Sequence, residues 1–279
     1  MPNYSALERL QLKVLDKAAS LVMAPTEQRT IYDQFTMTVA NTVDLAPNVR
    51  RITFRADQIA DYRHTGADEY FGLIMPPLGA PLMMPSEDRI NVRGAIRRMP
   101  EEQRPDLRWY TIRALRRAER EIDVDFVLHG DAGPGSRWAT RAEAGQEVGF
   151  RAGNATYRPA HDGPRLLAAD ETALPALSAI LEAHRDEDIR AYVEVPDDTY
   201  RLPIDSPVPV TWFVRGEDPP GSKLLPGVTG ADHGELGYAW LCGESSIATG
   251  LRRHLVRDRG VDRRRILFSG YWRVGAARE

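Results

Sequence analysis

The chain has 279 residues, of which 42% are hydrophobic and 28% charged, with a formal net charge of −3. This balance is ordinary for a soluble globular protein, and it predicts binding of the whole chain to neither nucleic acid nor membranes. The length suits one large domain or two modest ones. Cys242 is the single cysteine, which excludes an intrachain disulfide and a cysteine-held iron–sulfur cluster, and we expect it to be buried and inert.

Charge is distributed unevenly along the chain. Residues 89–120 hold ten Arg against four acids and residues 251–279 hold nine Arg against three acids, whereas residues 121–250 hold 22 acids against ten Lys and Arg. Basic blocks of this kind are typical of solvated faces, and they also suit an anionic cofactor or substrate. Neither an apolar signal region nor a stretch of 18 apolar residues is found, so we expect a cytoplasmic protein without integral membrane contact.

Residues 5–23 carry an amphipathic helical pattern. The residues on its apolar face are Leu7, Leu10, Val14, Ala18 and Leu21. We expect this helix to form an N-terminal extension over residues 1–30 and to pack against the body of the protein or a partner chain.

From residue 31 the pattern changes to short strands. The candidates are residues 34–43, 49–56, 69–75, 108–115, 121–128 and 147–152, separated by Gly, Pro and Asp. Strands in this spacing favour a small antiparallel barrel over residues 31–160. The loop from Pro76 to Pro105 is long for such a barrel, which is typical of a functional or mobile segment.

After a polar linker at Arg158–Pro164, apolar runs alternate with helical patterns. The expected strands are Leu166–Ala169, Ala191–Val195, Val208–Val214, Tyr238–Cys242 and Ile266–Phe268, and the expected helices are Thr172–His184 and Ser245–Val256. This alternation favours a mostly parallel α/β domain over residues 164–279, whose ligands lie above the carboxyl ends of the strands. Arg215, directly after one of these strands, suits either a 2′-phosphate contact or a surface charge.

The segment Arg108–Arg113 (RWYTIR) is the first with a chemical pattern. Strand alternation places Arg108, Tyr110 and Ile112 on one face and Trp109, Thr111 and Arg113 on the other. A flavin needs an aromatic surface and a nearby hydroxyl or N–H group, and the planar fork of Arg matches the oxygens of its diphosphate. An exposed aromatic strand with solubilising arginines explains the segment equally well.

The segment His129–Ala139 (HGDAGPGSRWA) follows an expected strand. Its three glycines permit close approach of a ligand, and Ser136 is placed to cap a helix that begins near Arg137. A helix N-terminus favours an anionic diphosphate. A tight turn followed by a capped helix is the plainer interpretation, and His129 alone is more typical of a structural hydrogen-bonding residue than of a catalyst.

The segment Asp170–Pro175 (DETALP) joins the first strand of the second domain to its helix. Pro175 fits only the first helical turn, so the helix begins near Thr172. The N–H groups there suit a dinucleotide phosphate, although the Gly-x-Gly-x-x-Gly pattern is absent and Asp170 and Glu171 can be caps. Because a nucleophile elbow, a metal-binding His pattern and a P-loop are also absent, the pattern indicates a cofactor that supplies the chemistry.

Four collinear motifs resemble those of the siderophore-interacting proteins, which are FAD-dependent ferric-siderophore reductases with a ferredoxin-reductase-like fold. They are RWYTIR at 108–113, HGDAGPGSRWA at 129–139, DETALP at 170–175, and the pair Gly243-Glu244 with GYWRVG at 270–275. The resemblance extends more loosely over residues 31–279. It implies an antiparallel Greek-key FAD-binding barrel, followed by a mostly parallel α/β domain for NADH or NADPH, with ferredoxin as another possible donor.

The resemblance also implies roles for particular residues. The FAD contacts carried over are Arg108, Trp109, Tyr110, Thr111, Arg113, His129, Gly130, Gly133, Pro134, Ser136, Trp138 and Ala139. The nicotinamide side would be bordered by Asp170, Glu171, Thr172, Ala173, Glu244, Tyr271 and Trp272. Two positions depart from the family pattern: Ala169 stands where Gly usually precedes the DETALP segment, and Gly72 stands where members often carry a Lys that contributes to siderophore binding.

Three functions are therefore weighed. The first is reduction of ferric siderophores, with the electrons passing through FAD. The second is a flavin reductase of the same fold that acts on another acceptor, as the absent Lys at position 72 suggests. The third is a protein that binds ferric chelates without a flavin. The donor, the siderophore and the oligomeric state are left open by the sequence.

Overall fold

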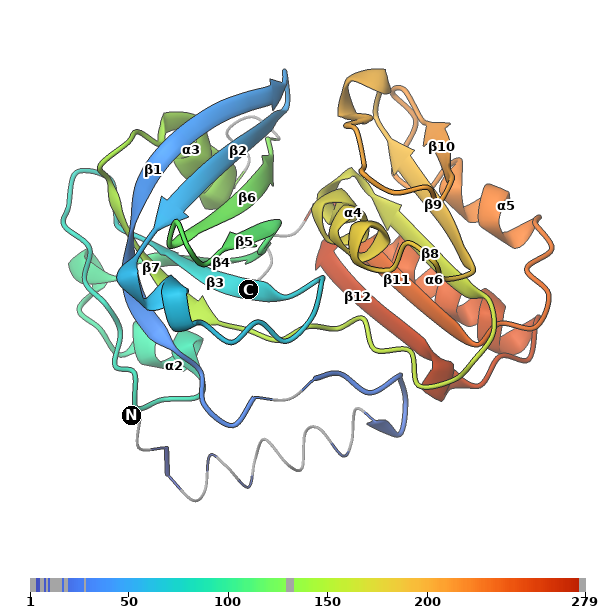
Figure 1. Ribbon diagram of the computed structural model, residues 1–279, viewed down its shortest axis with the longest axis horizontal. Coiled ribbons are helices and arrows are strands. Elements are labelled where there is room, and N and C mark those ends of the chain that lie inside the picture. The colour runs from blue at the N-terminus through green and yellow to red at the C-terminus, as the bar shows by residue number, and fades with distance from the viewer. Residues whose placement is uncertain are drawn as a thin grey trace. The chain divides into compact units, whose positions relative to one another are not determined.

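The computed structural model describes residues 4, 5, 8, 10, 17, 20–27, 29–128 and 133–275 (Figure 1). The chain divides into two compact units, which are described separately. The first comprises Met1–Lys17 and Glu27–Ala155, and the second comprises Ala18–Thr26 and Thr156–Glu279.

The first unit is built on one antiparallel sheet of seven strands. Its strands are β1 (Gln34–Ala46), β2 (Val49–Arg55), β3 (Tyr70–Met75), β4 (Asp106–Thr111), β5 (Ala114–Arg116), β6 (Glu121–Val127) and β7 (Glu147–Ala152). They lie in the order β4-β3-β7-β1-β2-β6-β5, so strands distant in the sequence, such as β1 and β7, are direct neighbours. The predicted Greek-key barrel is confirmed.

The two edges of the sheet meet at a bend between β4 and β5, which the sequence pattern did not predict. The prediction of one strand over residues 108–115 is wrong, because the chain bends after Thr111 and β4 and β5 lie at opposite edges of the sheet. At the bend, the Ile112 N–H donates to the Glu69 carbonyl at 2.8 Å, and the Arg113 N–H donates to the Asp123 carbonyl at 2.8 Å. Two adjacent residues thus join the two edges, and alternation of side chains cannot reveal such a corner.

Alternation along the strands fills the barrel with aromatic and branched side chains. On β2, Ile52 and Phe54 are fully buried. Phe150 of β7 lies between two other rings, with centroids 4.5 Å from Phe35 and 4.9 Å from Phe71. Burial of each such side chain stabilises the fold by about 1.5–3 kcal/mol, so this aromatic stack is a main source of the barrel's stability.

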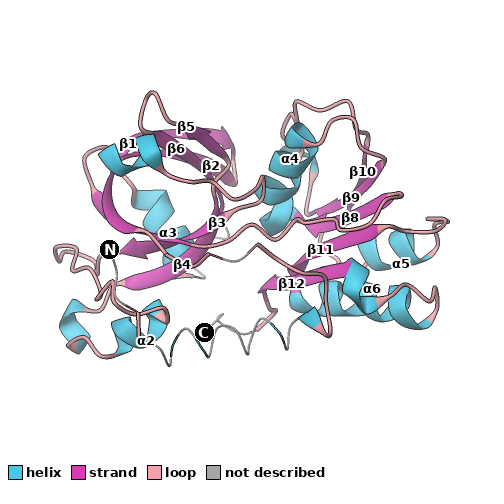
Figure 2. Ribbon diagram, turned by 60° about the horizontal axis from the view of Figure 1, so that its bottom comes forward, coloured by secondary structure: helices cyan, strands magenta, loops and turns pink. Residues whose placement is uncertain are grey.

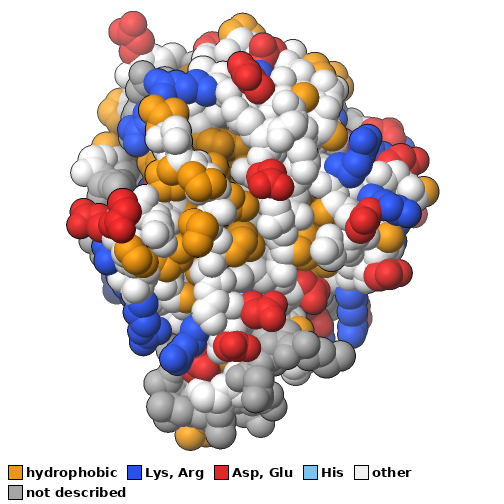
Figure 3. Space-filling view, turned by 90° about the vertical axis from the view of Figure 1, so that its left-hand side faces the viewer, with side chains coloured by type: hydrophobic (Ala, Val, Ile, Leu, Met, Phe, Trp, Pro, Cys, Tyr) orange, Lys and Arg blue, Asp and Glu red, His pale blue; other side chains and the backbone are white. Residues whose placement is uncertain are grey.

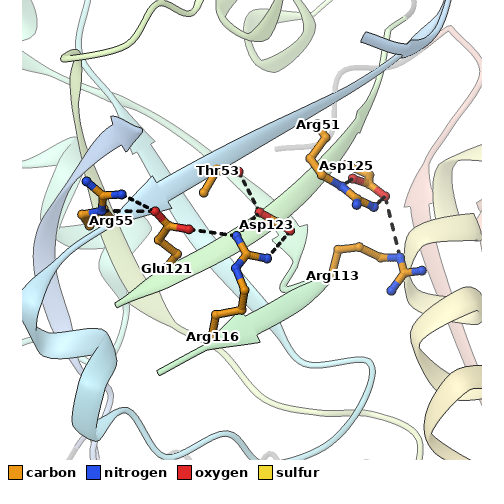
Figure 4. A network of polar contacts seen from close by, with 8 residues as sticks. All are labelled: Arg51, Thr53, Arg55, Arg113, Arg116, Glu121, Asp123 and Asp125. Atoms are coloured by element: carbon orange, nitrogen blue, oxygen red, sulfur yellow. Dashed lines mark hydrogen bonds and ion pairs between the residues drawn. The ribbon is translucent and has the colours of Figure 1, made fainter. Parts of the chain in front are cut away.

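The outward face of β2, β6 and β5 carries a network of ion pairs (Figure 4). Arg51 binds Asp125 through two hydrogen bonds of 2.6 and 2.8 Å. Asp123 accepts from Thr53 at 2.7 Å and from Arg116 at 2.5 and 2.8 Å. The first basic block therefore has part of its charge neutralised by carboxylates of its own barrel.

The segment between Pro76 and Pro105 contains a helix that the sequence analysis left as loop. Helix α2 (Val92–Arg97) begins at Asn91, whose side chain accepts from the Gly94 N–H at 2.9 Å. Its residues Val92 and Ile96 pack with Ile74 of β3 in a second small core. Large apolar side chains of the same segment remain exposed, Leu78 at 88% and Met83 at 43%, and Figure 3 shows apolar side chains gathered on this side of the barrel unit.

The second unit is a five-stranded parallel sheet with helices on both faces (Figure 2). Its elements are β8 (Arg165–Asp170), α4 (Leu174–Ala183), β9 (Ile189–Val195), β10 (Val210–Val214), α5 (Leu224–Thr229), β11 (Tyr238–Glu244), α6 (Ser245–Arg257) and β12 (Ile266–Trp272). The strand order is β10-β9-β8-β11-β12, with α4 on one face and α5 and α6 on the other. The predicted parallel α/β domain is confirmed, and Cys242 is buried within it as expected.

The structure describes only two of the five residues predicted to form the apolar face of the N-terminal helix, Leu10 and Leu21. Leu7, Val14 and Ala18 lie outside the described residues. Leu10 and Leu21 are each 59% exposed, so these two side chains do not pack against the body of this chain, and packing against a partner chain stays a prediction. None of the described helices has the length and apolarity needed to cross a bilayer.

Candidate functional site

Helix α3 (Pro134–Arg141) lies against β4 in the first unit. Its N-cap is Gly133, which has extended backbone and no side chain to cap the helix, and Pro134 occupies the first turn. The prediction that Ser136 caps a helix beginning near Arg137 is therefore wrong, because Ser136 already lies within the first turn. A helix start without a capping side chain is a suitable place for an anion.

Tyr110 and Gly135 fit together at the start of α3. A Cβ atom at position 135 would collide with the Tyr110 hydroxyl and would lie 3.5 Å from the Cγ atom of Arg108. The other side of the Tyr110 ring packs on Phe126, with centroids 4.3 Å apart. Glycine at position 135 is thus what allows the tyrosine and the stem of Arg108 to lie directly beneath the helix.

Several strong donors on β4 lack acidic partners among the described residues. Arg108 donates to the Leu107 carbonyl at 2.7 Å, and no described carboxylate pairs with its guanidinium. Burial raises the pKa of the Tyr110 hydroxyl, which therefore stays a neutral donor, and neither it nor the Thr111 hydroxyl is bonded to a described residue. A half-buried guanidinium and a tyrosine hydroxyl beside a helix start, with a threonine hydroxyl next along the strand, suit a planar, hydrogen-bonding ring and a diphosphate, so these residues fit FAD.

The other predicted FAD contacts fall in different surroundings. Trp109 lies on the opposite face of β4, edge-on to Tyr70 with centroids 5.3 Å apart. Arg113 lies 3.7 Å from the Asp125 carboxylate in the outward network. Trp138 stacks near Phe54, and Ala139 is fully buried in the barrel core. His129 and Gly130 lie outside the described residues.

Gly72 is explained by Trp109. A Cβ at position 72 would lie 2.8 Å from Leu107 Cδ1 and 3.2 Å from the Trp109 ring. The two residues are direct partners across β3 and β4, so the indole covers the glycine. A lysine at this position would have to displace the end of the Leu107 side chain and would press on the Trp109 ring.

In the second unit Asp170 is the centre of a buried cluster at the carboxyl ends of β8, β11 and β12. Its Oδ1 accepts from the Thr172 N–H at 2.9 Å and from the Thr172 hydroxyl. Its Oδ2 accepts from the Glu244 N–H at 2.6 Å and from the Trp272 indole at 2.8 Å. Gly243, with φ +135, keeps the backbone clear, since a Cβ there would lie 2.6 Å from the carboxyl carbon. The cluster thus unites two segments of the predicted nicotinamide site.

The electrostatics of this cluster favour proton uptake by Asp170. Burial, and then the negative charge of Glu171, raise the pKa of Asp170 to about 6 despite its hydrogen bonds. Glu171 is itself buried and pairs with Arg215 through two 2.8 Å hydrogen bonds. Arg215 is therefore not a surface charge, which corrects one of the two alternatives drawn from the sequence, and its terminal nitrogens are already paired with Glu171.

Glu194 and Glu244 accept hydrogen bonds from other backbone N–H groups near the carboxyl ends of the strands. Glu194, at 0% exposure, accepts from the N–H groups of Gly221, Lys223 and Leu224 at 2.6–2.9 Å. Burial opposes the charge of Glu244, yet hydrogen bonds from residues that include Ser246 hold its pKa below the ordinary value. Glu244 thereby caps α6, and it also accepts from the Val274 N–H at 3.3 Å, just beyond Trp272.

The structure brings Asp170, Thr172, Glu244 and Trp272 into direct contact, as hydrogen-bonded partners around one carboxylate. Ala173 is buried and Tyr271 is half-buried at its place in β12. The sequence analysis missed Glu194 and left the role of Arg215 open. One signal was available for Glu194, which is the single charge within the apolar strand Ala191–Val195.

Comparisons with known proteins agree with this architecture. The profile of the siderophore-interacting FAD-binding domain matches residues 38–156, and that of the siderophore-interacting protein matches residues 164–275. The Mycobacterium tuberculosis protein Rv2895c is 37% identical over 201 residues, which are 65% of this chain and 70% of that protein. The ferric vibriobactin reductase ViuB of Vibrio cholerae is 26% identical over 252 residues, 84% of this chain and 88% of that protein.

Among solved structures, the siderophore-interacting protein SipS from Aeromonas hydrophila is similar at 30% identity with a TM-score of 0.71. The match covers 87% of this chain and 99% of SipS. Because both halves match the family and a relative is matched along nearly its whole length, the chain belongs to the siderophore-interacting protein family, with a siderophore-interacting FAD-binding domain at residues 38–156.

Proposed function

We propose that this protein is an FAD-dependent reductase of ferric siderophores that draws electrons from a nicotinamide dinucleotide. The observation that carries the proposal is the donor-rich part of β4: Arg108 and Tyr110 lie beside the uncapped start of α3 and have no acidic partner among the described residues, and Thr111 follows them on the strand. The relative ViuB, named a ferric vibriobactin reductase, supports the substrate class.

The chain's own residues would divide the work between the two units. Arg108 would bind the diphosphate, while Tyr110 and Thr111 would hold the ring through their hydroxyls, and Gly133, Pro134 and Ser136 at the start of α3 would complete the site. Asp170, Thr172 and Trp272 would border the nicotinamide. Bound FAD supplies the redox chemistry, since a flavin accepts two electrons as a hydride and can deliver them singly to ferric iron. One dinucleotide would therefore reduce two ferric ions to ferrous ions, and the siderophore holds ferrous iron only weakly. We propose a cytoplasmic site of action, where reduced dinucleotides are available.

The proposal is tested by two measurements on the purified full chain. Its visible spectrum should carry flavin bands, and anaerobic addition of a reduced dinucleotide should bleach them. Addition of a ferric siderophore should then restore the bands while a ferrous-specific chelator records two equivalents of ferrous iron per flavin. A protein that stays colourless after addition of FAD contradicts the proposal.

The packing of Gly72 gives weight to a second candidate, a flavin reductase with another acceptor. This chain has no lysine at position 72 for an anionic chelate, and Leu107 and Trp109 crowd the place where one would begin. Turnover of ferric siderophores no faster than that of quinones or generic dyes would favour this candidate.

A further inference from the structure

The loops after β9 and β10 carry the charged residues that favour or oppose binding of the 2′-phosphate that distinguishes NADPH from NADH. In dinucleotide-binding sheets the dinucleotide crosses the carboxyl ends of the strands. A carboxylate near the second strand accepts the ribose 2′-hydroxyl of NADH, whereas a nearby arginine accommodates the 2′-phosphate of NADPH. The second strand in chain order here is β9, which lies between β8 and β10. The two loops are residues 196–201 and 215–223.

The best-placed arginine of this region is already bound. The Arg215 side chain is 9% exposed, and its two terminal nitrogens each donate to a Glu171 oxygen at 2.8 Å. Glu194 lies 3.8 Å from the same guanidinium. Although burial opposes its charge, these contacts hold the pKa of Arg215 above the ordinary value. Turning it toward a phosphate would leave two buried carboxylates without their counter-charge, which is strongly unfavourable.

The other cations of the two loops are also paired. Arg201 binds Asp198 at 3.0 Å, and Lys223 binds Asp218 at 2.9 Å. These pairs are exposed, and pairs of this kind contribute about 0–1 kcal/mol, so they reduce the attraction for a phosphate without abolishing it.

A carboxylate suited to a ribose hydroxyl stands directly after β9. The Oδ1 of Asp197 accepts from the Thr199 N–H at 2.8 Å and from the Thr199 hydroxyl at 2.5 Å. These contacts fix the exposed side chain, and no described residue donates to its Oδ2. Asp197 can therefore accept from a 2′-hydroxyl, and it would repel a 2′-phosphate in the same place.

The charge around the ends of β8, β9 and β10 points the same way. Seven carboxylates lie at or directly after the ends of β8, β9 and β10, against three cations. The carboxylates are Asp170, Glu171, Glu194, Asp197, Asp198, Glu217 and Asp218, and the cations are Arg201, Arg215 and Lys223. A 2′-phosphate brings about 1.5 to 2 further negative charges into this field.

We infer that the second unit selects a dinucleotide without a 2′-phosphate, so that NADH and not NADPH is the electron donor. The specificity arises from the locked Arg215–Glu171 pair, from the open carboxylate oxygen of Asp197, and from the neutralised cations Arg201 and Lys223. This inference rests on the proposed nicotinamide-dependent function.

The test uses equilibrium binding as well as kinetics. Calorimetric titration of the full chain with ADP-ribose and with its 2′-phosphorylated form, at low ionic strength, should give at least tenfold tighter binding of ADP-ribose. The kcat/KM for flavin reduction should favour NADH over NADPH by a similar factor. The double variant D198N/D218N, which releases Arg201 and Lys223, should narrow both ratios at least threefold.

A matched control separates local from general charge effects. The variant D205N/D232N removes the same charge from the exposed partners of Arg185 and Arg259 and should leave both ratios unchanged. Equal or tighter binding of the 2′-phosphorylated ligand, or the same narrowing in the control, overturns the inference. If neither dinucleotide reduces the flavin, the proposed function fails, and the binding ratio still decides the selectivity.

Discussion

The Trp272 indole donates to the Asp170 carboxylate across 2.8 Å, although the two residues are 102 positions apart. This bond joins the ends of β8 and β12, the outer members of a three-strand group with β11 between them. Since Asp170 also accepts from the Glu244 N–H, one carboxylate fixes the carboxyl ends of all three strands. All four groups that bind the Asp170 carboxylate are hydrogen-bond donors, two on each oxygen. Both atoms at the end of this side chain must therefore be acceptors.

Replacement of Asp170 by asparagine should disrupt this arrangement. An amide would direct an NH₂ group at two donors, either those on Oδ1 or those on Oδ2, and would leave buried polar groups unsatisfied. We expect a loss of about 2–4 kcal/mol in the free energy of unfolding, measured by urea denaturation. Trp272→Phe removes one donor only and should cost about 1 kcal/mol. Wild-type stability of D170N would contradict this assignment.

The raised pKa of Asp170 gives a pH dependence with a defined sign. Its pKa is about 6 in the folded protein against an ordinary value of 3.8, so between these values the folded state holds a proton that the unfolded state has lost. The contribution of this group to stability is therefore greatest below about pH 4, falls as the pH rises toward 6, and is constant above that. Glu244, with its lowered pKa, acts in the opposite sense, so a local probe is needed.

Trp272 is that probe. Its fluorescence should titrate with a midpoint near pH 6, because protonation of Asp170 removes the negative charge beside the indole and weakens the hydrogen bond that the indole donates. The transition should disappear in D170N, and the difference spectrum between wild type and W272F should contain it. A transition that persists in D170N would assign the titration to another group.

Arg215 should be essential to the stability of the second unit. Arg215→Met leaves Glu171 and Glu194 buried without their counter-charge, and we expect a loss of about 3–5 kcal/mol in the free energy of unfolding. The double variant R215M/E171Q should recover part of this loss, because it removes one of the two buried charges. Lys223→Met breaks an exposed pair and should cost less than about 1 kcal/mol. If urea titrations gave the same loss of unfolding free energy for Arg215→Met and Lys223→Met, the buried pair would contribute no more to stability than the exposed one, contrary to this prediction.

Restoration of the lysine that many family members carry at position 72 should be harmful here. Gly72→Lys forces a side chain against Leu107 and the Trp109 ring, and such overpacking costs about 1–3 kcal/mol. The substitution should lower the melting temperature and give no gain in affinity for an anionic ferric chelate. Leu78→Lys, at an 88% exposed position of the neighbouring segment, is the matched control and should leave the melting temperature unchanged. Unaltered stability of G72K would show that the site has room.

The two-domain architecture could be predicted from the sequence because short-range patterns record it. Alternation of apolar residues marked the strands, and Pro175 placed the start of its helix correctly, since Pro lies in the first turn of α4. The family motifs gave the FAD-binding barrel. Side-chain facing on β4 was also predictable, since Arg108 and Tyr110 lie beneath α3 while Trp109 lies over Gly72.

Features set by distant partners could not be predicted. The bend after Thr111 depends on Glu69 and Asp123, which come from two other parts of the chain. Ser136 has the residue type of a cap, but Pro134 starts the helix one turn earlier. Arg215 resembles a surface charge in the sequence. Its side chain is buried because it pairs with Glu171, which is 44 residues away in the sequence. In each case tertiary contacts outweigh the local preference.

The central claim, that β4 and the start of α3 hold FAD, is tested most directly by an FAD titration of flavin-free protein, followed by the quenching of flavin fluorescence. The dissociation constant should rise at least tenfold in Arg108→Gln, since a charged hydrogen bond to phosphate contributes about 1.5–3 kcal/mol. Arg104→Gln, at an exposed arginine that bonds the Met99 carbonyl, should bind FAD as the wild type does. Equal affinity of the Arg108 variant, with its fold intact, would contradict the assignment of the flavin to this strand.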